Sequence, residues 1–171
     1  MTRSTDRFIP LSKRVDIAND SHADLFVSVH SNANRVRSLN GFEVYYVASS
    51  VNDSSRAMLA AKNAGLNLDG SSFASHSLDL KATVWDMIYT LDRAESIELS
   101  RSICRIMDSS LDCRIIGIKG ARFYVLKGAR MPAILIEAGF LSNPSEERKL
   151  KNGFYRQKIA EGILQGIRDY A

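Results

Sequence analysis

Residues 132–137 read Pro-Ala-Ile-Leu-Ile-Glu, so that four apolar residues lead directly into a carboxylate. A short aliphatic run of this kind, entered through a proline, is typical of a buried β-strand. A second such run, Leu25-Phe26-Val27-Ser28-Val29, ends directly before His30. The sequence therefore predicts two buried strands, each followed by an ionisable side chain, Glu137 in one case and His30 in the other.

Segments with helical and strand-like patterns alternate along the rest of the chain. Aromatic and β-branched content predicts two further strands, and apolar spacing with capping signals predicts the helices. The expected strands are 25–29, 42–47, 123–126 and 133–136, and the expected helices are 11–19, 52–66 and 80–107, the last as one helix or two abutting ones. Asn143-Pro144 opens a last helix, with Glu146 at its third position. Its apolar side carries Tyr155, Ile159, Ile163 and Ile167. This alternation favours a layered α/β fold of the three-layer α/β/α type. No linker divides the sequence, so we expect one domain over residues 1–171.

Composition excludes several classes of protein. The 171 residues are 45% hydrophobic and 25% charged, and no apolar run is long enough to span a bilayer. Residues 1–7 lack the apolar stretch of a secretory signal. With only Cys104 and Cys113, a disulfide scaffold is excluded, and we expect both to be small core residues, although one bridge between them remains open.

The chain is basic, with a formal net charge of +4. This balance suits an anionic polymer, either nucleic acid or cell wall. Lysine and arginine are scattered among acidic residues, without an arginine-rich helix or a ribonucleoprotein-type aromatic motif, so we do not expect a nucleic-acid partner.

His30 and Glu137 are the candidates for chemistry. Catalytic groups of open α/β sheets gather beyond the carboxyl ends of the strands, so the two side chains share one edge if their strands are parallel. A buried carboxylate needs a compensating partner, which a zinc-bound water would provide for Glu137 while His30 binds the metal. The alternatives are a hydrogen-bonded structural histidine and a Glu137 that pairs with Arg122 or Arg130.

Other catalytic arrangements are not supported. His22 lies between a helix and a strand and His76 lies in a serine-rich loop, so we expect both to be solvated. There is no Gly-x-Ser-x-Gly elbow, no phosphate-binding loop and no dinucleotide glycine motif.

At these residues the sequence resembles the zinc-dependent N-acetylmuramoyl-L-alanine amidases of the type 3 family. Two blocks carry the resemblance, one that leads to the family's second metal-binding histidine and one that holds its catalytic glutamate. The first block comprises Met1-Thr2-Arg3, Asp6, Leu11, Arg14, Ala18-Asn19, the run Ala23-Asp24-Leu25-Phe26-Val27-Ser28-Val29-His30-Ser31-Asn32-Ala33 and Gly41-Phe42-Glu43-Val44-Tyr45; the second comprises Gly117-Ile118-Lys119, Phe123, Val125, Leu126 and the run from Pro132 to Asn143.

The resemblance implies a function and a set of roles. His30 would be a zinc ligand, Glu137 the catalytic base that returns its proton to the departing amine, and Asn32 a residue of the substrate-binding rim or a local turn-former. The substrate would be peptidoglycan, cut at the amide between N-acetylmuramic acid and L-alanine. A periplasmic or cell-envelope location and regulation by an activator protein are also implied.

The sequence also departs from the family pattern at its start. In the family, a first histidine and a glutamate ligand come from a strand and helix that precede the Thr-Arg motif. Nothing precedes Met1 here, so we expect this chain to lack the first strand and helix, to carry part of the metal site, and to be inactive by itself. A non-catalytic peptidoglycan-binding module, or degenerate amidase, is the alternative function.

Overall fold

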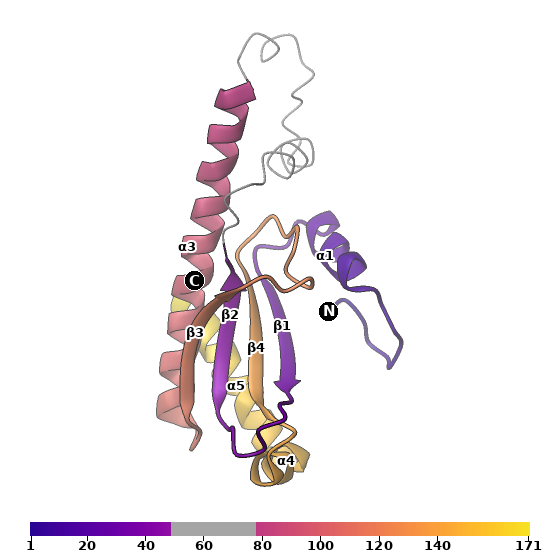
Figure 1. The fold of residues 1–171 in the computed structure, drawn as a ribbon, viewed down its shortest axis with the longest axis vertical. Coiled ribbons are helices and arrows are strands. Elements are labelled where there is room, and N and C mark those ends of the chain that lie inside the picture. The colour runs from indigo at the N-terminus through magenta and orange to yellow at the C-terminus, as the bar shows by residue number, and fades with distance from the viewer. Residues whose placement is uncertain (49–77) are drawn as a thin grey trace.

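The computed structural model describes residues 1–48 and 78–171, and only the backbone over 78–88. In chain order these residues form α1 (Leu11–Asp20), β1 (Phe26–Asn32), β2 (Phe42–Val47), α3 (Leu78–Ser110), β3 (Ile115–Ala121), β4 (Ala133–Phe140), α4 (Pro144–Lys151) and α5 (Gly153–Tyr170) (Figure 1). The predicted helix 52–66 and the loop that contains His76 lie outside the described residues. None of the described helices has the length and apolar character that crossing a membrane requires.

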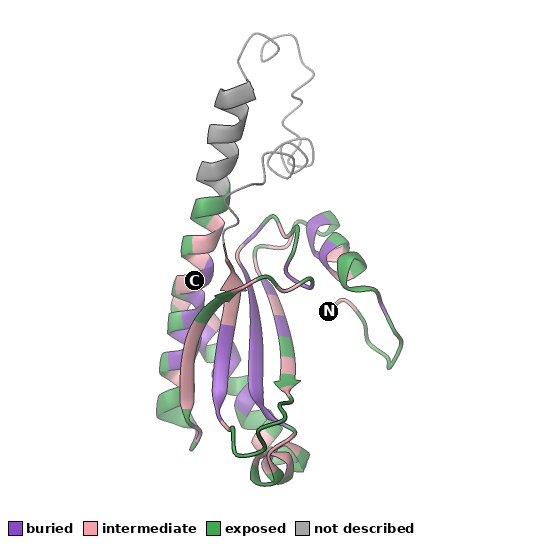
Figure 2. Cartoon of the chain, in the orientation of Figure 1, coloured by how far each residue is buried: buried purple, intermediate pink, exposed green. Residues whose placement is uncertain are grey.

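The strands form one mixed sheet in the order β1-β4-β2-β3. β1 is parallel to β4 and β2 is parallel to β3, whereas β2 runs antiparallel to β4. Every residue of β4 is buried, as expected for a central strand that is covered on both faces (Figure 2). The strands that carry His30 and Glu137 are therefore parallel, which is the condition under which the two side chains were expected to share one edge.

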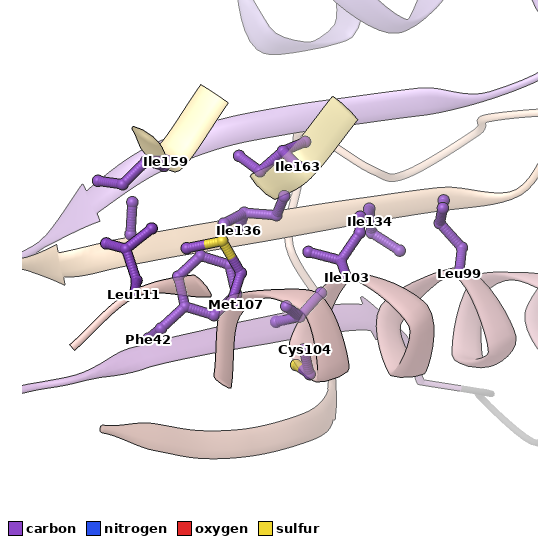
Figure 3. Packing of buried hydrophobic residues seen from close by; sticks show 12 residues of the cluster. Phe42, Leu99, Ile103, Cys104, Met107, Leu111, Ile134, Ile136, Ile159 and Ile163 are labelled. Atoms are coloured by element: carbon purple, nitrogen blue, oxygen red, sulfur yellow. The ribbon is translucent and has the colours of Figure 1, made fainter. Parts of the chain in front are cut away.

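Helices cover both faces of this sheet. On one face, α3 and α5 pack against apolar residues of β2 and β4, with Ile103, Met107 and Ile163 meeting Ile134 and Ile136 in the main core (Figure 3). On the other face, α1 and the segment 123–131 form a second apolar cluster against β1 and β4. The layered α/β arrangement with flanking helices is the one that the sequence predicts.

The two long helices pack closely because α5 presents glycines to α3. A Cβ atom added at Gly166 would lie 2.6 Å from Ile103 Cα, and one added at Gly162 would lie 2.6 Å from Met107 Sδ. A larger side chain at Gly166 would meet the backbone of α3 and does not fit, whereas one at Gly162 would require the Met107 side chain to move. This close contact places both helices against one face of β4, the strand that carries Glu137.

Two sequence predictions about the elements are wrong. The predicted strand 123–126 is a turn, because Val125 and Leu126 bury their side chains in the cluster beneath α1 without pairing to a strand. The strand that follows α3 is instead β3, which contains Gly117 and Gly120 and so has a weak β-propensity. The predicted last helix is also divided in two, since Asn152 ends α4 and its side chain caps α5.

The two cysteines are free thiols, so the bridge that the sequence left open is not formed. Cys104 is buried in the main core, and Cys113 is partly buried beside it. Burial raises the pKa of both thiols to about 11. Both residues therefore act as small apolar side chains, as the sequence predicts.

The start of α4 fastens two strands together. Asn143 caps the helix as predicted, accepting hydrogen bonds from the Ser145 and Glu146 amides. The Glu146 carboxylate does not serve its own helix but accepts the Phe140 amide at 2.7 Å and the Gly41 amide at 3.1 Å. Gly41 has φ +122°, and a Cβ atom there would lie 2.5 Å from the Arg114 carbonyl oxygen. Glu146 thus joins the end of β4 to the residue before β2.

Replacing Glu146 by alanine is expected to lower the free energy of unfolding by about 2–4 kcal/mol. Two backbone amides would lose a charged acceptor, and each unsatisfied buried amide costs about 1–3 kcal/mol. Urea unfolding followed by circular dichroism measures the loss. Glu147→Ala is the matched control, because Glu147 is the next residue of the same helix turn and forms an exposed ion pair with Lys151. Equal effects of the two substitutions would contradict this role of Glu146.

Candidate active site

His30 and Glu137 face each other across the parallel pair β1 and β4, where they are register partners. The sequence placed them just beyond their strands, but both lie within them: β1 continues to Asn32 and β4 continues to Phe140. The pairing of β1 with β4 continues past a bulge, where Asn32 and Phe140 are register partners. The expected juxtaposition is therefore present, inside the sheet rather than at its edge.

Glu43 extends this pair into a row of three ionisable residues. Glu43 of β2 is the antiparallel register partner of Glu137, so His30, Glu137 and Glu43 lie side by side on β1, β4 and β2. Opposite residues of paired strands project to the same face of a sheet. Glu43 was expected only as part of the block that resembles the family, although a single carboxylate within the apolar strand 42–47 was a usable signal.

Glu137 is buried, and one of its carboxylate oxygens has no partner among the residues that the structure describes. Glu137 is only 8% exposed, and its Oε2 atom has no hydrogen-bond partner among the described residues. Burial, followed by repulsion from Glu43, raises the pKa of Glu137 to about 7. An arginine partner would lower that pKa instead, so the described residues do not support pairing with Arg122 or Arg130.

Glu43, in contrast, is fully compensated although it is only 3% exposed. Its Oε2 atom accepts a hydrogen bond from Lys119 Nζ at 2.7 Å, and its Oε1 atom accepts one from Asn32 Nδ2 at 3.0 Å. Burial and a hydrogen bond to Glu43 raise the pKa of Tyr45 to about 12. The two neighbouring carboxylates thus differ: Glu43 is held by donors, and Glu137 keeps lone pairs available for a proton.

His30 has the properties of a metal ligand. Its Nε2 atom lies 3.0 Å from the Ser28 hydroxyl, a contact that fixes the ring and leaves the other ring nitrogen as a potential donor to a metal. Burial, followed by the positive charge of Arg14 on α1, lowers the pKa of His30. The imidazole is therefore neutral near pH 7, which is the form that binds zinc.

The remaining candidates lie elsewhere or have other partners. His22 is exposed in the turn after α1, at φ +48°, as the sequence predicts for a solvated residue. Within residues 1–48 and 89–171, no group of three or more His, Cys, Asp and Glu is arranged to hold a metal ion. His30 and Glu137 thus fit one ligand and the base of a zinc site, and further ligands would come from outside the described residues.

The raised pKa of Glu137 predicts how stability depends on pH in the metal-free protein. The folded state holds this proton up to about pH 7, compared with 4.5 for an ordinary glutamate, so the free energy of unfolding falls as the pH rises through this interval. Glu137→Gln removes the buried charge. The variant is expected to gain stability relative to the wild type by about 1–3 kcal/mol above pH 7 and little below pH 4.5.

Urea unfolding at pH 4.5 and pH 8, in the presence of a chelator, measures this difference. Glu161→Gln is the control, because Glu161 is exposed on α5. A Glu137→Gln effect of the same size at both pH values would contradict a buried, proton-holding Glu137.

The fold and the row of residues define a class of protein: a layered α/β domain whose sheet carries a buried carboxylate beside an imidazole. A family model described as N-acetylmuramoyl-L-alanine amidase matches residues 1–169. The chain therefore belongs to the type 3 family of N-acetylmuramoyl-L-alanine amidases, as its sequence blocks indicated.

Individual relatives agree with this assignment. The chain is 34% identical to the N-acetylmuramoyl-L-alanine amidase AmiC of Escherichia coli O6:H1, over 99% of this chain and 41% of that protein. Among solved structures, an N-acetylmuramoyl-L-alanine amidase of Clostridium difficile 630 is similar with a TM-score of 0.70 at 31% identity, covering 98% of this chain and 68% of that one. AmiC2 of Nostoc punctiforme is similar with a TM-score of 0.67 at 28% identity, covering 99% and 69%. The chain thus spans less than half of the E. coli relative.

Proposed function

We propose that this protein hydrolyses the amide between N-acetylmuramic acid and L-alanine in peptidoglycan, with zinc as its cofactor. The observation that carries the proposal is the pairing of buried Glu137 with His30 on adjacent parallel strands. Membership of the amidase family supports the substrate. The neutral imidazole of His30 supports the metal.

Glu137 performs the proton transfers in this proposal. When bound, zinc supplies the Lewis acidity that polarises the scissile carbonyl and makes water a stronger acid. A carboxylate oxygen of Glu137 takes a proton from the attacking water and later gives it to the nitrogen of the departing L-alanine. A pKa of about 7 suits both transfers, because the group accepts and releases a proton near neutral pH.

Asn32 has a supporting role in this site. Its Oδ1 atom accepts the Ala33 amide at 2.8 Å, and its Nδ2 atom donates to Glu43. We assign it to the rim of the substrate site, where it fixes the end of β1 and the Glu43 carboxylate. From the proposed substrate we also propose a periplasmic or cell-envelope location, and from the family resemblance an activator protein as a partner.

A defined substrate tests the proposed function. The full-length protein is incubated with a synthetic muramoyl-L-alanyl peptide, and release of the L-alanyl amine is measured with a chelator and after zinc is restored. We expect release that the chelator stops and zinc recovers. Binding of the peptide without release would favour a non-catalytic module, and release that survives chelation would contradict the zinc assignment.

A further inference from the structure

Lys119 is a cation that the proposed reaction does not use, although it lies on the same face of the sheet as Glu137. It belongs to β3, and its ammonium group reaches Glu43 at 2.7 Å while lying 5.8 Å from the centre of the Tyr45 ring. Glu43 is in turn the register partner of Glu137. One buried carboxylate therefore separates this ammonium from the proposed base.

The position of Lys119 is fixed, but its charge remains accessible. Its side chain is 48% exposed, whereas that of Glu43 is 3% exposed. An ammonium has three N–H donors, of which Glu43 takes one, so the exposed side has donors left for another acceptor. The Tyr45 ring and Glu43 together restrict the movement of a side chain that is normally flexible.

Stability alone does not account for this arrangement. Removing the Glu43 carboxylate from water costs free energy that burying an apolar residue of similar size does not. A buried acid in a strand therefore contributes little to the stability of the fold. Glu137 lies on the same face and is nine-tenths buried. Its Oε2 atom has no partner among the described residues. The face is thus arranged for an external ligand with groups that meet both side chains.

We propose that Lys119 binds a carboxylate on the peptide portion of the substrate, and that Glu43 is the positioning residue that holds Lys119 for this purpose. The inference rests on the proposed amidase function and adds a specificity to it. The preferred substrate carries a free carboxylate, not a carboxamide, close to the scissile amide.

The spacing of the strands indicates where that carboxylate lies in the substrate. Paired strands are about 4.8 Å apart, so the Lys119 ammonium, bonded to Glu43, lies roughly 5–10 Å from the Glu137 carboxylate. An extended peptide advances about 3.3 Å per residue. A carboxylate on the first or second residue beyond L-alanine therefore reaches Lys119 while the scissile amide lies at Glu137.

Two synthetic muramoyl dipeptides that differ only at the second residue test the inference. One ends in a free α-carboxylate and the other in the α-carboxamide, with the side-chain carboxylate amidated in both. Their dissociation constants are measured by calorimetry with zinc-loaded, full-length protein that carries Glu137→Gln, so that no turnover occurs. Wild-type Lys119 is expected to favour the acid by about tenfold, the worth of one charge-assisted hydrogen bond.

Lys119→Met in that background is expected to remove the preference by weakening the acid about tenfold and leaving the amide unchanged. Lys119→Arg should retain part of the preference, and Glu43→Gln should reduce it because the ammonium loses its anchor. Lys158→Met is the matched control, since Lys158 also lies over an aromatic ring, Phe154, but on α5. Circular dichroism confirms that each variant is folded.

The possible outcomes separate the inference from the function on which it rests. Equal affinity of the wild-type side chain for acid and amide, or equal weakening of both by Lys119→Met, would overturn the assignment of Lys119 and leave the amidase proposal intact. If neither dipeptide binds and the enzyme with Glu137 releases no amine from them, both proposals are contradicted.

Discussion

Replacing Glu137 by glutamine is expected to lower kcat/KM for amide hydrolysis by about a thousandfold, within the range that general acid–base catalysis contributes. Glutamine keeps the size of the side chain, but it can neither take the proton from water nor return it to the leaving amine. The loss should fall on kcat, with KM little changed, because the substituted atom exchanges protons and does not anchor the substrate. Steady-state kinetics on a muramoyl-L-alanyl peptide measures the effect.

The control for this experiment is Glu161→Gln, which makes the same chemical change on the exposed side of α5. The zinc content of both variants should match that of the wild type, and neither variant should unfold at a lower temperature than the wild type. A Glu137→Gln enzyme that retained more than about a tenth of the wild-type kcat would remove Glu137 from the catalytic role, since such a loss is below that expected for a general base.

Replacing His30 by alanine is expected to weaken zinc binding by about a hundredfold and to abolish turnover. Loss of an outer-shell partner alone costs about ten- to a hundredfold in metal affinity, and a direct ligand contributes at least as much. Competition with a chromophoric chelator measures the affinity independently of activity. Glu137→Gln, by contrast, should bind zinc like the wild type, so the two substitutions separate metal binding from proton transfer.

His22→Asn is the matched control for His30. His22 is exposed at φ +48°, a backbone conformation that asparagine tolerates well, so this variant removes an imidazole without strain. Its zinc affinity should equal that of the wild type. Unchanged zinc affinity in His30→Ala, or a loss in His22→Asn of the same size, would contradict the assigned ligand.

Local patterns were sufficient to predict the strands of the site. The apolar runs before His30 and Glu137 predicted two buried strands, and the rule about strand ends predicted that the two residues share a site. The structure adds the direct register pairing and shows that both strands continue past these residues. The continuation was not predicted because the polar His30 and Glu137 ended the apolar runs on which the strand predictions relied.

Other parts of the sheet depend on contacts between distant residues. β4 lies between β1 and β2, and no local pattern specifies that insertion or the antiparallel direction of β2. The segment 123–126 has the composition of a strand, but it buries its apolar side chains as a turn against α1, while glycine-containing β3 pairs at the edge. In both cases tertiary packing overrides β-propensity.

The polar network of the site was also beyond local reasoning. Lys119 lies 76 positions from Glu43 in the sequence, and Asn32 reaches Glu43 from the far side of β4. Their ion pair and hydrogen bond appear only once the strand order is known. A carboxylate within an apolar strand is nevertheless a local signal, and Glu43 shows that it should be treated as a candidate site residue whatever its partners.

The most direct test of the central claim is the chemistry of the products released from purified peptidoglycan. The full-length, zinc-loaded protein is incubated with the polymer, and the products are analysed by mass spectrometry and amino-terminal labelling. We expect free peptides that begin with an L-alanine amine together with glycan chains that lack peptides, and neither product with the Glu137→Gln variant. New reducing sugar ends, new amino termini at other residues, or L-alanine termini at an undiminished rate in Glu137→Gln would contradict an amidase that depends on Glu137.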